Sequence, residues 1–248
     1  ASAKARCIRF PVDEVRVFMG RTSSGIRGIA LEQGDRVISM TILQSAAFAP
    51  EERDAFIRMT TARRRTPDAM EGASEGAVET SAEEPGEENG SALLLSEERY
   101  AEMAANEDII LTIAANGLGK RTSAYDYRVT RRGGKGIVLM DLASEDNSVA
   151  AAFPVGERDE LVLVTNGGQL IRVGVGDIRI ARRSTRGVRI FHVAEGEKVV
   201  SVTRLAEDAE AAAEDAAAAA AAGEAVTLTL PPSGDGAGED EAPESGET

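Results

Sequence analysis

The sequence predicts an all-β protein built as an array of bladed repeats, and three observations support this. Three segments, starting at Cys7, Gly119 and Leu170, can be laid over one another. The glycines that close the polar loop in the second and third copies, Gly136 and Gly187, are 51 residues apart. Each copy also alternates apolar and polar residues between turns rich in glycine and acid. A period of about 50 residues with about four short strands is typical of a bladed β architecture.

The elements follow one another in the same order in every copy. A basic residue opens an alternating stretch, a polar loop closed by glycine follows, and a short strand, an acidic turn and a final apolar strand complete the copy. The opening residues are Arg9, Arg121 and Arg172, and the closing glycines are Gly25, Gly136 and Gly187. Upstream, "IILTIAANG" and "LVLVTNGG" place Asn116-Gly117 and Asn166-Gly167 as hairpin turns.

An insertion and a tail interrupt this pattern. Within the insertion, "PEERDAFIRM" and "SEERYAEMAA" predict short helices, the second with Ser96 as N-cap. The acidic stretch between them, residues 69–92, and the tail are low in apolar side chains other than alanine and are expected to be disordered. The predicted divisions are a partial first repeat 1–43, the insertion 44–108, a second repeat 109–157, a third repeat 158–205 and the acidic tail 206–248.

The charge is distributed unevenly along the 248 residues. The net charge of −14 suggests an acidic protein, but residues 1–50 carry +3 and residues 109–204 carry +5, while residues 51–108 carry −10 and residues 205–248 carry −12. Basic repeats with acidic appendages favour a nucleic-acid partner. Without Trp, the core should be aliphatic. The sequence has no apolar run long enough to span a membrane and no basic-then-apolar leader, so we expect a cytoplasmic protein.

Catalytic and metal-binding motifs fit the chain poorly. One cysteine and one histidine, Cys7 and His192, give no zinc spacing and are expected in the core or on a strand face. "AANGLGKRT" lacks both the first glycine and the Ser/Thr of a phosphate-binding loop, and no dinucleotide fingerprint is present. Tyr125 and Tyr127 lie within a repeat and are expected to pack there rather than to react. We therefore expect no catalytic site, no metal and no cofactor in this chain.

The basic loops recur, and they are the best functional candidates. "RRGGKG" in the second copy aligns with "RRSTRG" in the third and "GRTSSG" in the first. In a bladed array they would form a row of positive charge that neutralises successive phosphates without reading bases, although each loop alone is also compatible with an ordinary solvated turn. The candidate DNA-binding residues are Arg131, Arg132, Lys135, Gly133, Gly134, Gly136, Arg182, Arg183, Arg186, Arg21, Arg27, Lys120 and Arg121. Strand parity could turn Arg27, Lys120 and Arg121 away from DNA, and the glycines would act through backbone freedom.

At these residues the sequence resembles a known family, the C-terminal domain of the DNA gyrase A subunit. The resemblance covers nearly all of the chain outside the insertion and is carried by "EVRVFMGRTSSGIRGIALEQGDRVISM", "NGLGKRTSAYDYRVTRRGGKGIV" and "TNGGQLIRVGVGDIRIARRSTRGVRIFHVAEGEKVVSV". Residues 130–136 match six of the seven positions of the family's box Q-[RK]-R-G-G-[RK]-G, with Thr130 in place of Gln. In the family the full box belongs to the first blade, so this stretch is similar to a loop of a later blade.

The resemblance implies a fold and a function. The family domain is a six-bladed β-pinwheel around which DNA wraps, so this chain would supply about three blades, half of the ring, as a fragment of a longer protein. The parent enzyme is an ATP-dependent type II topoisomerase that introduces negative supercoils. Its partners would be double-stranded DNA and, in the full-length protein, an A-subunit dimer with two B subunits, while ATP and Mg²⁺ would bind elsewhere.

Two other interpretations stay open at this stage. One is the related C-terminal array of the topoisomerase IV A-type subunit, which an intact box upstream of these residues would exclude. The other is a protein-interaction propeller that does not bind DNA, for which binding should be insensitive to salt.

Overall fold

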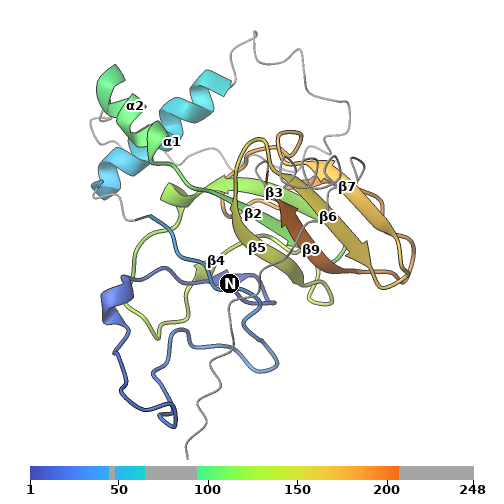
Figure 1. Cartoon of the computed structure of the whole chain (residues 1–248). Coiled ribbons are helices and arrows are strands. Elements are labelled where there is room, and N and C mark those ends of the chain that lie inside the picture. Colours follow the sequence, from blue (N-terminus) through green and yellow to red (C-terminus); the bar gives the residue numbers. More distant parts are fainter. Residues whose placement is uncertain (45–47, 65–93, 207–248) are drawn as a thin grey trace, which may run out of the picture. The chain divides into compact units, whose positions relative to one another are not determined.

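Residues 1–44, 48–64 and 94–206 are described by the computed structural model. These ranges form nine β-strands, two α-helices and two short 3₁₀ turns (Figure 1). The first repeat and the insertion contain β1 (Arg6–Cys7), η1 (Val12–Glu14), α1 (Pro50–Arg64) and α2 (Glu97–Ala105). The second repeat contains β2 (Ile109–Ala114), β3 (Leu118–Ser123), η3 (Ala124–Asp126), β4 (Ile137–Val138) and β5 (Val149–Val155). The third contains β6 (Glu160–Thr165), β7 (Leu170–Gly174), β8 (Val188–Arg189) and β9 (Val199–Leu205).

The two larger sheets are built on the same plan, as the repeat pattern predicts. In both, the first strand of the repeat lies between the second and the last: β2 pairs antiparallel with β3 and β5, and β6 pairs antiparallel with β7 and β9. The order is β5-β2-β3-β8 in one sheet and β7-β6-β9 in the other. The described part of the chain is thus mostly β outside the insertion, as expected.

The third strand of each repeat pairs with the repeat before it. β4 pairs with β1 of the first repeat, and β8 pairs with β3 of the second. A sheet therefore mixes strands from two repeats, which the predicted blades did not show. Glycine is required at this joint. Gly136 and Gly187 have φ of 71° and 86°, and a Cβ at either one would collide with the carbonyl oxygen of Cys7 or Gly119 on the partner strand.

The largest hydrophobic cluster joins the two larger sheets. Leu111 and Ile113 of β2 and Leu161 and Leu163 of β6 are fully buried in it, and Phe191 is its one buried aromatic side chain. A second cluster contains Cys7, Tyr127, Leu139 and Met140 and fixes the N-terminal segment to the four-stranded sheet. The expectation of an aliphatic core is confirmed for these sheets.

The helices of the insertion form a third cluster, and here the aromatic residues gather. Phe56 of α1 and Tyr125 of η3 meet edge to face with ring centroids 5.4 Å apart, and the Tyr125 hydroxyl donates to the Met103 carbonyl of α2 at 2.9 Å. Both predicted helices are confirmed, α1 running on to Arg64, and Ser96 Oγ accepts from the Arg99 N–H as an N-cap at 3.2 Å. Tyr125 packs as expected, but against helices rather than within a strand.

The predicted hairpin turns hold, with one difference in detail. Asn116-Gly117 joins β2 to β3, and Gly117 has φ of 81°. Between β6 and β7 the left-handed residue is Gly168, with φ of 84°, rather than a residue of the predicted pair Asn166-Gly167. The two turns have the same length, because Ile113 pairs with Gly119 and Val164 pairs with Leu170. Gly168 therefore corresponds to Gly117, and the Asn166-Gly167 pair lies one residue before the place of Asn116-Gly117.

Residues 1–44 form fewer strands than the alternating pattern predicts. The strand pairings that involve this range are β1 with β4 and two isolated bridges, one between Ser2 and Val37 and one between Arg9 and Val129. In the later repeats the third strand pairs with the repeat before, and the last strand pairs with the first strand of its own repeat. Within these 248 residues the first repeat has no repeat before it, and only residues 1–5 precede β1. Apolar side chains such as Met19, Met40 and Ile42 are accordingly exposed.

The structure confirms the expectations for Cys7 and Tyr127 and contradicts the one for His192. Cys7 and Tyr127 are buried, and burial raises the pKa of the Cys7 thiol to about 11. The expectation that His192 lies in the core or on a strand face is wrong, because it is exposed in an irregular segment, where its Nδ1 lies 3.0 Å from Arg189 Nη1. The acidic stretch 69–92 and all of the predicted tail beyond residue 206 lie outside the described residues.

Candidate nucleic-acid interface

Three basic loops, residues 20–25, 131–136 and 182–187, are referred to below as the first, second and third loops. The second loop lies against the segment that follows the first, since the Gly133 N–H donates to the Gly28 carbonyl at 2.5 Å and the Ala30 N–H donates to the Gly134 carbonyl at 2.9 Å. The third lies in the same way against the segment that follows the second, with the Asp141 N–H donating to the Thr185 carbonyl at 3.3 Å. The second and third loops therefore lie at the two successive joints between the three repeats.

The second arginine of each later loop fixes that loop to the repeat before it. The Arg132 N–H donates to Glu14 Oε2 at 3.0 Å, and its Nη1 donates to the Arg27 carbonyl at 3.1 Å. The Arg183 N–H donates to Asp126 Oδ2 at 2.7 Å, and its Nη1 donates to the Val138 carbonyl. Both side chains are half-buried, so these predicted site residues position the loops.

The other cations of the second loop are free. Arg131 and Lys135 are exposed, and in the described part of the chain neither side chain makes a hydrogen bond or an ion pair. Gly133 and Gly136 have φ of 80° and 71°, the left-handed conformation that glycine adopts without strain, whereas Gly134 does not need it. This loop presents two uncompensated positive charges on a tightly turned backbone.

The third loop carries the same charges but pairs them. Arg182 reaches Asp126 with a 3.2 Å contact between Nη2 and Oδ1, and Arg186 reaches Asp141 with a 3.0 Å contact between Nη2 and Oδ2. The Arg182 and Arg186 side chains are still 53% and 37% exposed, so a ligand can reach both. A phosphate there would have to compete with carboxylates.

Lys120 and Arg121 do not lie at the surface with the other candidates. Lys120 is fully buried and its ammonium donates to the carbonyls of Arg182 and Thr185 at 2.9 and 2.8 Å and to that of Arg183. Burial lowers the pKa of Lys120 to about 7. Arg121 is 5% exposed and donates to the carbonyls of Ile178 and Gly176 and to Glu157. The two side chains lie on opposite faces of β3, and both are buried because both faces of this strand are covered. There Lys120 supports the third loop and Arg121 supports the turn before it.

The first loop is more open. Arg21 and Arg27 are exposed and, like Arg131, make no side-chain ion pair within the residues that the structure describes. Gly25 has φ of 74°, and a Cβ there would meet nothing within 4 Å. The first loop thus shares the turn of the others but not their packing against a preceding repeat.

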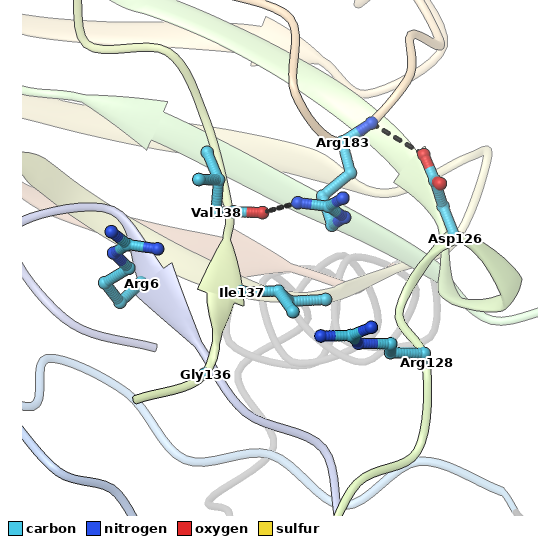
Figure 2. Close-up of a pocket in the computed structure, with 7 residues that line it drawn as sticks. All are labelled: Arg6, Asp126, Arg128, Gly136, Ile137, Val138 and Arg183. Atoms are coloured by element: carbon cyan, nitrogen blue, oxygen red, sulfur yellow. Dashed lines mark hydrogen bonds between the residues drawn. The ribbon is translucent and has the colours of Figure 1, made fainter. Parts of the chain in front are cut away.

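A basic pocket, which sequence reasoning missed, lies beside the second and third loops. Its volume is about 410 Å³, and it is lined by Arg6, Arg128, Arg183, Asp126 and residues 136–138 (Figure 2). In Figure 2 the guanidinium of Arg128 reaches toward Ile137 and that of Arg183 toward the Val138 carbonyl, with Arg6 across strand β4. One sequence signal could have indicated Arg128, because "EVRV", "DYRV" and "DIRI" place an arginine two residues after an acid in all three copies.

Within the described residues there is neither a cluster of metal-ligating side chains nor a helix able to span a membrane. No group of three or more His, Cys, Asp or Glu side chains is arranged there to hold a metal ion. Neither α1 nor α2, the helices within these ranges, has the length and apolar content needed to cross a membrane.

Comparison with known proteins gives consistent results. The model of the family described as DNA gyrase C-terminal domain, beta-propeller, matches residues 1–44, 108–155 and 159–206. The DNA gyrase A subunit of Granulibacter bethesdensis is 45% identical over 205 residues, and that of Rickettsia bellii is 42% identical over 215 residues. These alignments cover 82% and 87% of this chain but 22% of each relative, so the chain spans about a fifth of their length.

A solved structure resembles the fold. The C-terminal domain of DNA topoisomerase IV matches with a TM-score of 0.55 at 17% identity, over 87% of this chain and 50% of that one. At this identity the likeness concerns the fold alone.

Proposed function

The chain belongs to the DNA gyrase C-terminal domain family of β-propeller domains, and from that premise we propose that it binds double-stranded DNA along its row of basic loops and bends it. The observation that carries the proposal is the pair of exposed cations in the second loop, Arg131 and Lys135, which have no partner among the described residues. Cations that no carboxylate neutralises are the groups that gain most from meeting a phosphate.

The neighbouring loops support contact along a path rather than at one point. Arg182 and Arg186 of the third loop correspond in the repeat to Arg131 and Lys135 of the second. Arg21 of the first loop corresponds to Arg132, and Arg27 follows the first loop by two residues. Loops at successive joints between repeats would meet successive stretches of one duplex, and a path around blades arranged in a ring is curved. Backbone contacts of this kind position DNA without reading its sequence.

We further propose a role in a larger assembly. The three repeats would be consecutive blades of a six-bladed ring in the gyrase A subunit, and the bent DNA would set the sign of supercoiling by an ATP-dependent type II topoisomerase. DNA cleavage, ATP and Mg²⁺ would belong to other parts of an assembly of two A and two B subunits, working in the cytoplasm.

The first test measures DNA binding as salt is varied. Anisotropy of a short labelled duplex should show affinity falling by orders of magnitude between about 50 and 200 mM salt if roughly 6–10 phosphates are neutralised. Duplexes of unrelated sequence should bind alike. A flat response to salt would instead support a protein-interaction surface and contradict the proposal.

The second test measures wrapping as linking number. A nicked plasmid sealed by ligase in the presence of the chain should give a shifted distribution of topoisomers, because DNA held along a curved path that leaves one plane has writhe, and closure keeps that writhe as a change in linking number. The R131A/K135A double variant at equal concentration is the matched control, and its shift should be smaller. An unchanged distribution at saturating wild-type chain would show binding without wrapping.

A further inference from the structure

The basic pocket beside the second and third loops is not explained by DNA contact through the exposed loop cations alone. All three repeats contribute to it: Arg6 comes from the first, Arg128 from the second and Arg183 from the third. Its volume of about 410 Å³ lies within the range of about 300–1,000 Å³ seen for ligand pockets. Three guanidinium groups around one cavity favour an anion.

The acidic side chains near the pocket do not cancel this charge. Asp126, the one carboxylate in its lining, already accepts from the Arg183 N–H at 2.7 Å and from Arg182 Nη2 at 3.2 Å. Glu32 lies 3.9 Å from Arg6 Nη2, a long contact at the surface. Arg128 is exposed and makes no hydrogen bond or ion pair within the described residues. The pocket is therefore net positive.

A second, independent observation points to a missing acceptor. Arg183 Nε is buried and has no hydrogen-bond partner among the described residues. A buried donor left unsatisfied costs about 1–3 kcal/mol, so such groups usually have a partner in the working state. The corresponding atom at the preceding joint, Arg132 Nε, donates to the Glu14 carbonyl at 3.0 Å. Of the two arginines that fix a loop to the preceding repeat, the one at the pocket lacks this acceptor among the described residues.

We propose that the pocket holds one phosphate group of the DNA backbone, with Arg128, Arg6 and Arg183 as its ligands. The inference rests on the proposed function and extends it by naming a phosphate site at the joint between repeats. Arg183 Nε, the buried donor without a partner among the described residues, would donate to a phosphate oxygen once its side chain turns toward the cavity. Arg128 and Arg6 would supply charge from the other repeats, so the site is complete only when the repeats are assembled.

Substitution of Arg128 tests the site without disturbing a joint. Because Arg128 is exposed, R128Q should leave folding unchanged, whereas Arg183 fixes the third loop and is left intact. We expect R128Q to weaken binding of a short duplex about 5-fold and to lower the slope of log affinity against log salt by about 0.9, the value for one phosphate contact. R6Q should act in the same direction, and R128K should keep the wild-type slope.

Arg179 provides the matched control. It occupies the same place in the third repeat as Arg128 does in the second, it is exposed, and it does not line the pocket. R179Q removes the same charge and should change the slope and the affinity much less than R128Q does. Equal slopes for the wild type, R128Q and R179Q would overturn the phosphate site while leaving DNA binding by the chain intact.

Inorganic phosphate separates this inference from the proposed function. Arginine Nε–H signals followed by NMR should show one resonance that shifts saturably with inorganic phosphate in the wild type and not in R128Q, even if the chain failed to bind DNA. The short duplex should move the same resonance. A resonance that follows inorganic phosphate but ignores the duplex would assign the pocket to a free phosphate and overturn the DNA assignment. The absence of any saturable shift with either probe would overturn the site itself.

Discussion

The second and third loops share one backbone and differ in what surrounds their charges. Both loops end in a left-handed glycine that packs on a backbone carbonyl of the preceding repeat. Both are also fixed by a carboxylate of that repeat, Glu14 for the second loop and Asp126 for the third. In the third loop, buried Lys120 holds the carbonyls and two carboxylates pair the outer arginines. In the second, Ile8 takes the place that corresponds to Lys120, and Arg131 and Lys135 have no partner among the described residues.

The difference shows that one turn can serve two purposes. The glycine and the fixed arginine specify the joint, and the remaining side chains decide whether its charge is available. The third loop is mainly a structural joint whose arginines are partly neutralised. The second loop offers its charge to a ligand, and we expect it to dominate DNA binding.

The largest effect should come from what the two loops share. G136A and G187A each place a Cβ against a backbone carbonyl at positive φ, and we expect each to lower the free energy of unfolding by about 3 kcal/mol or more. G25A has the same φ constraint in open space and should cost about 1 kcal/mol. Urea unfolding followed by far-UV circular dichroism measures all three, since the chain has no Trp. A G136A variant as stable as G25A would contradict the packed joint.

The next effect should separate the two loops. K120M removes the ammonium that binds three carbonyls of the third loop. We expect the free energy of unfolding to fall by about 2 kcal/mol, because the cost of leaving the carbonyls unsatisfied exceeds the gain from no longer burying a cation. I8M, at the corresponding place under the second loop, should change the free energy of unfolding by less than about 1 kcal/mol. Equal losses in the two variants would show that Lys120 does not distinguish the loops.

The effect of K120M should also depend on pH. The native pKa of Lys120 is lowered from 10.5 to about 7, so above pH 7 the unfolded state binds the proton more tightly than the native state. The free energy of unfolding should therefore rise between about pH 7 and the unfolded pKa of 10.5, at a limiting slope of about 1.4 kcal/mol per pH unit. The lowered pKa of the Ala1 amino group acts in the same direction, so the relevant quantity is the difference between the wild type and K120M. A difference that stays constant above pH 7 would contradict the lowered pKa.

A smaller effect should appear in DNA affinity. R131A/K135A removes unpaired charge and should weaken duplex binding about 10-fold, with a slope against log salt lower by about 1.8. R182A/R186A removes charge that Asp126 and Asp141 already offset, and should weaken binding about 3-fold. Anisotropy at matched salt compares the two variants. A greater loss in the third loop would reverse our ranking of the loops.

The smallest effect is expected from a substitution that makes the third loop resemble the second by releasing one of its arginines. D141N releases Arg186 from its half-exposed partner and should tighten duplex binding about 2-fold, with stability changed by less than about 1 kcal/mol. E145Q removes an equal charge from an exposed position that pairs with no arginine in the described ranges, so it measures the general electrostatic effect. If D141N and E145Q tighten binding equally, release of Arg186 contributes nothing.

Several local features followed from the sequence because their causes lie within a few residues. The Ser96 cap, the turn at Asn116-Gly117 and the left-handed glycines at the loop ends each depend on short-range geometry. The strand exchange could not be predicted, because Cys7 pairs with Ile137 at a separation of 130 residues and no local pattern names that partner. Too many strands were predicted in residues 1–44, because alternation does not show whether a strand has a partner to pair with.

The candidate site was predicted in part. The three loops and their order follow from the alignment of the copies, and that alignment also contains the arginine at Arg16, Arg128 and Arg179. Lys120 and Arg121 lie on opposite faces of β3, and both are buried because third-repeat segments cover both faces of the strand. Alternation alone predicts one buried and one exposed side chain. The pocket escaped prediction because its arginines come from three repeats that only folding brings together.

By itself, the sequence determined the repeats, the places of the turns and the loops that carry positive charge, because hydrophobic period, glycine and capping residues act locally. Only the tertiary structure decided which of those charges are available. Lys120 and Lys135 are the same residue type 15 positions apart, yet one is buried under carbonyls and the other is exposed without a partner in the described residues. Burial and pairing depend on neighbours from other repeats, and those neighbours are set by packing.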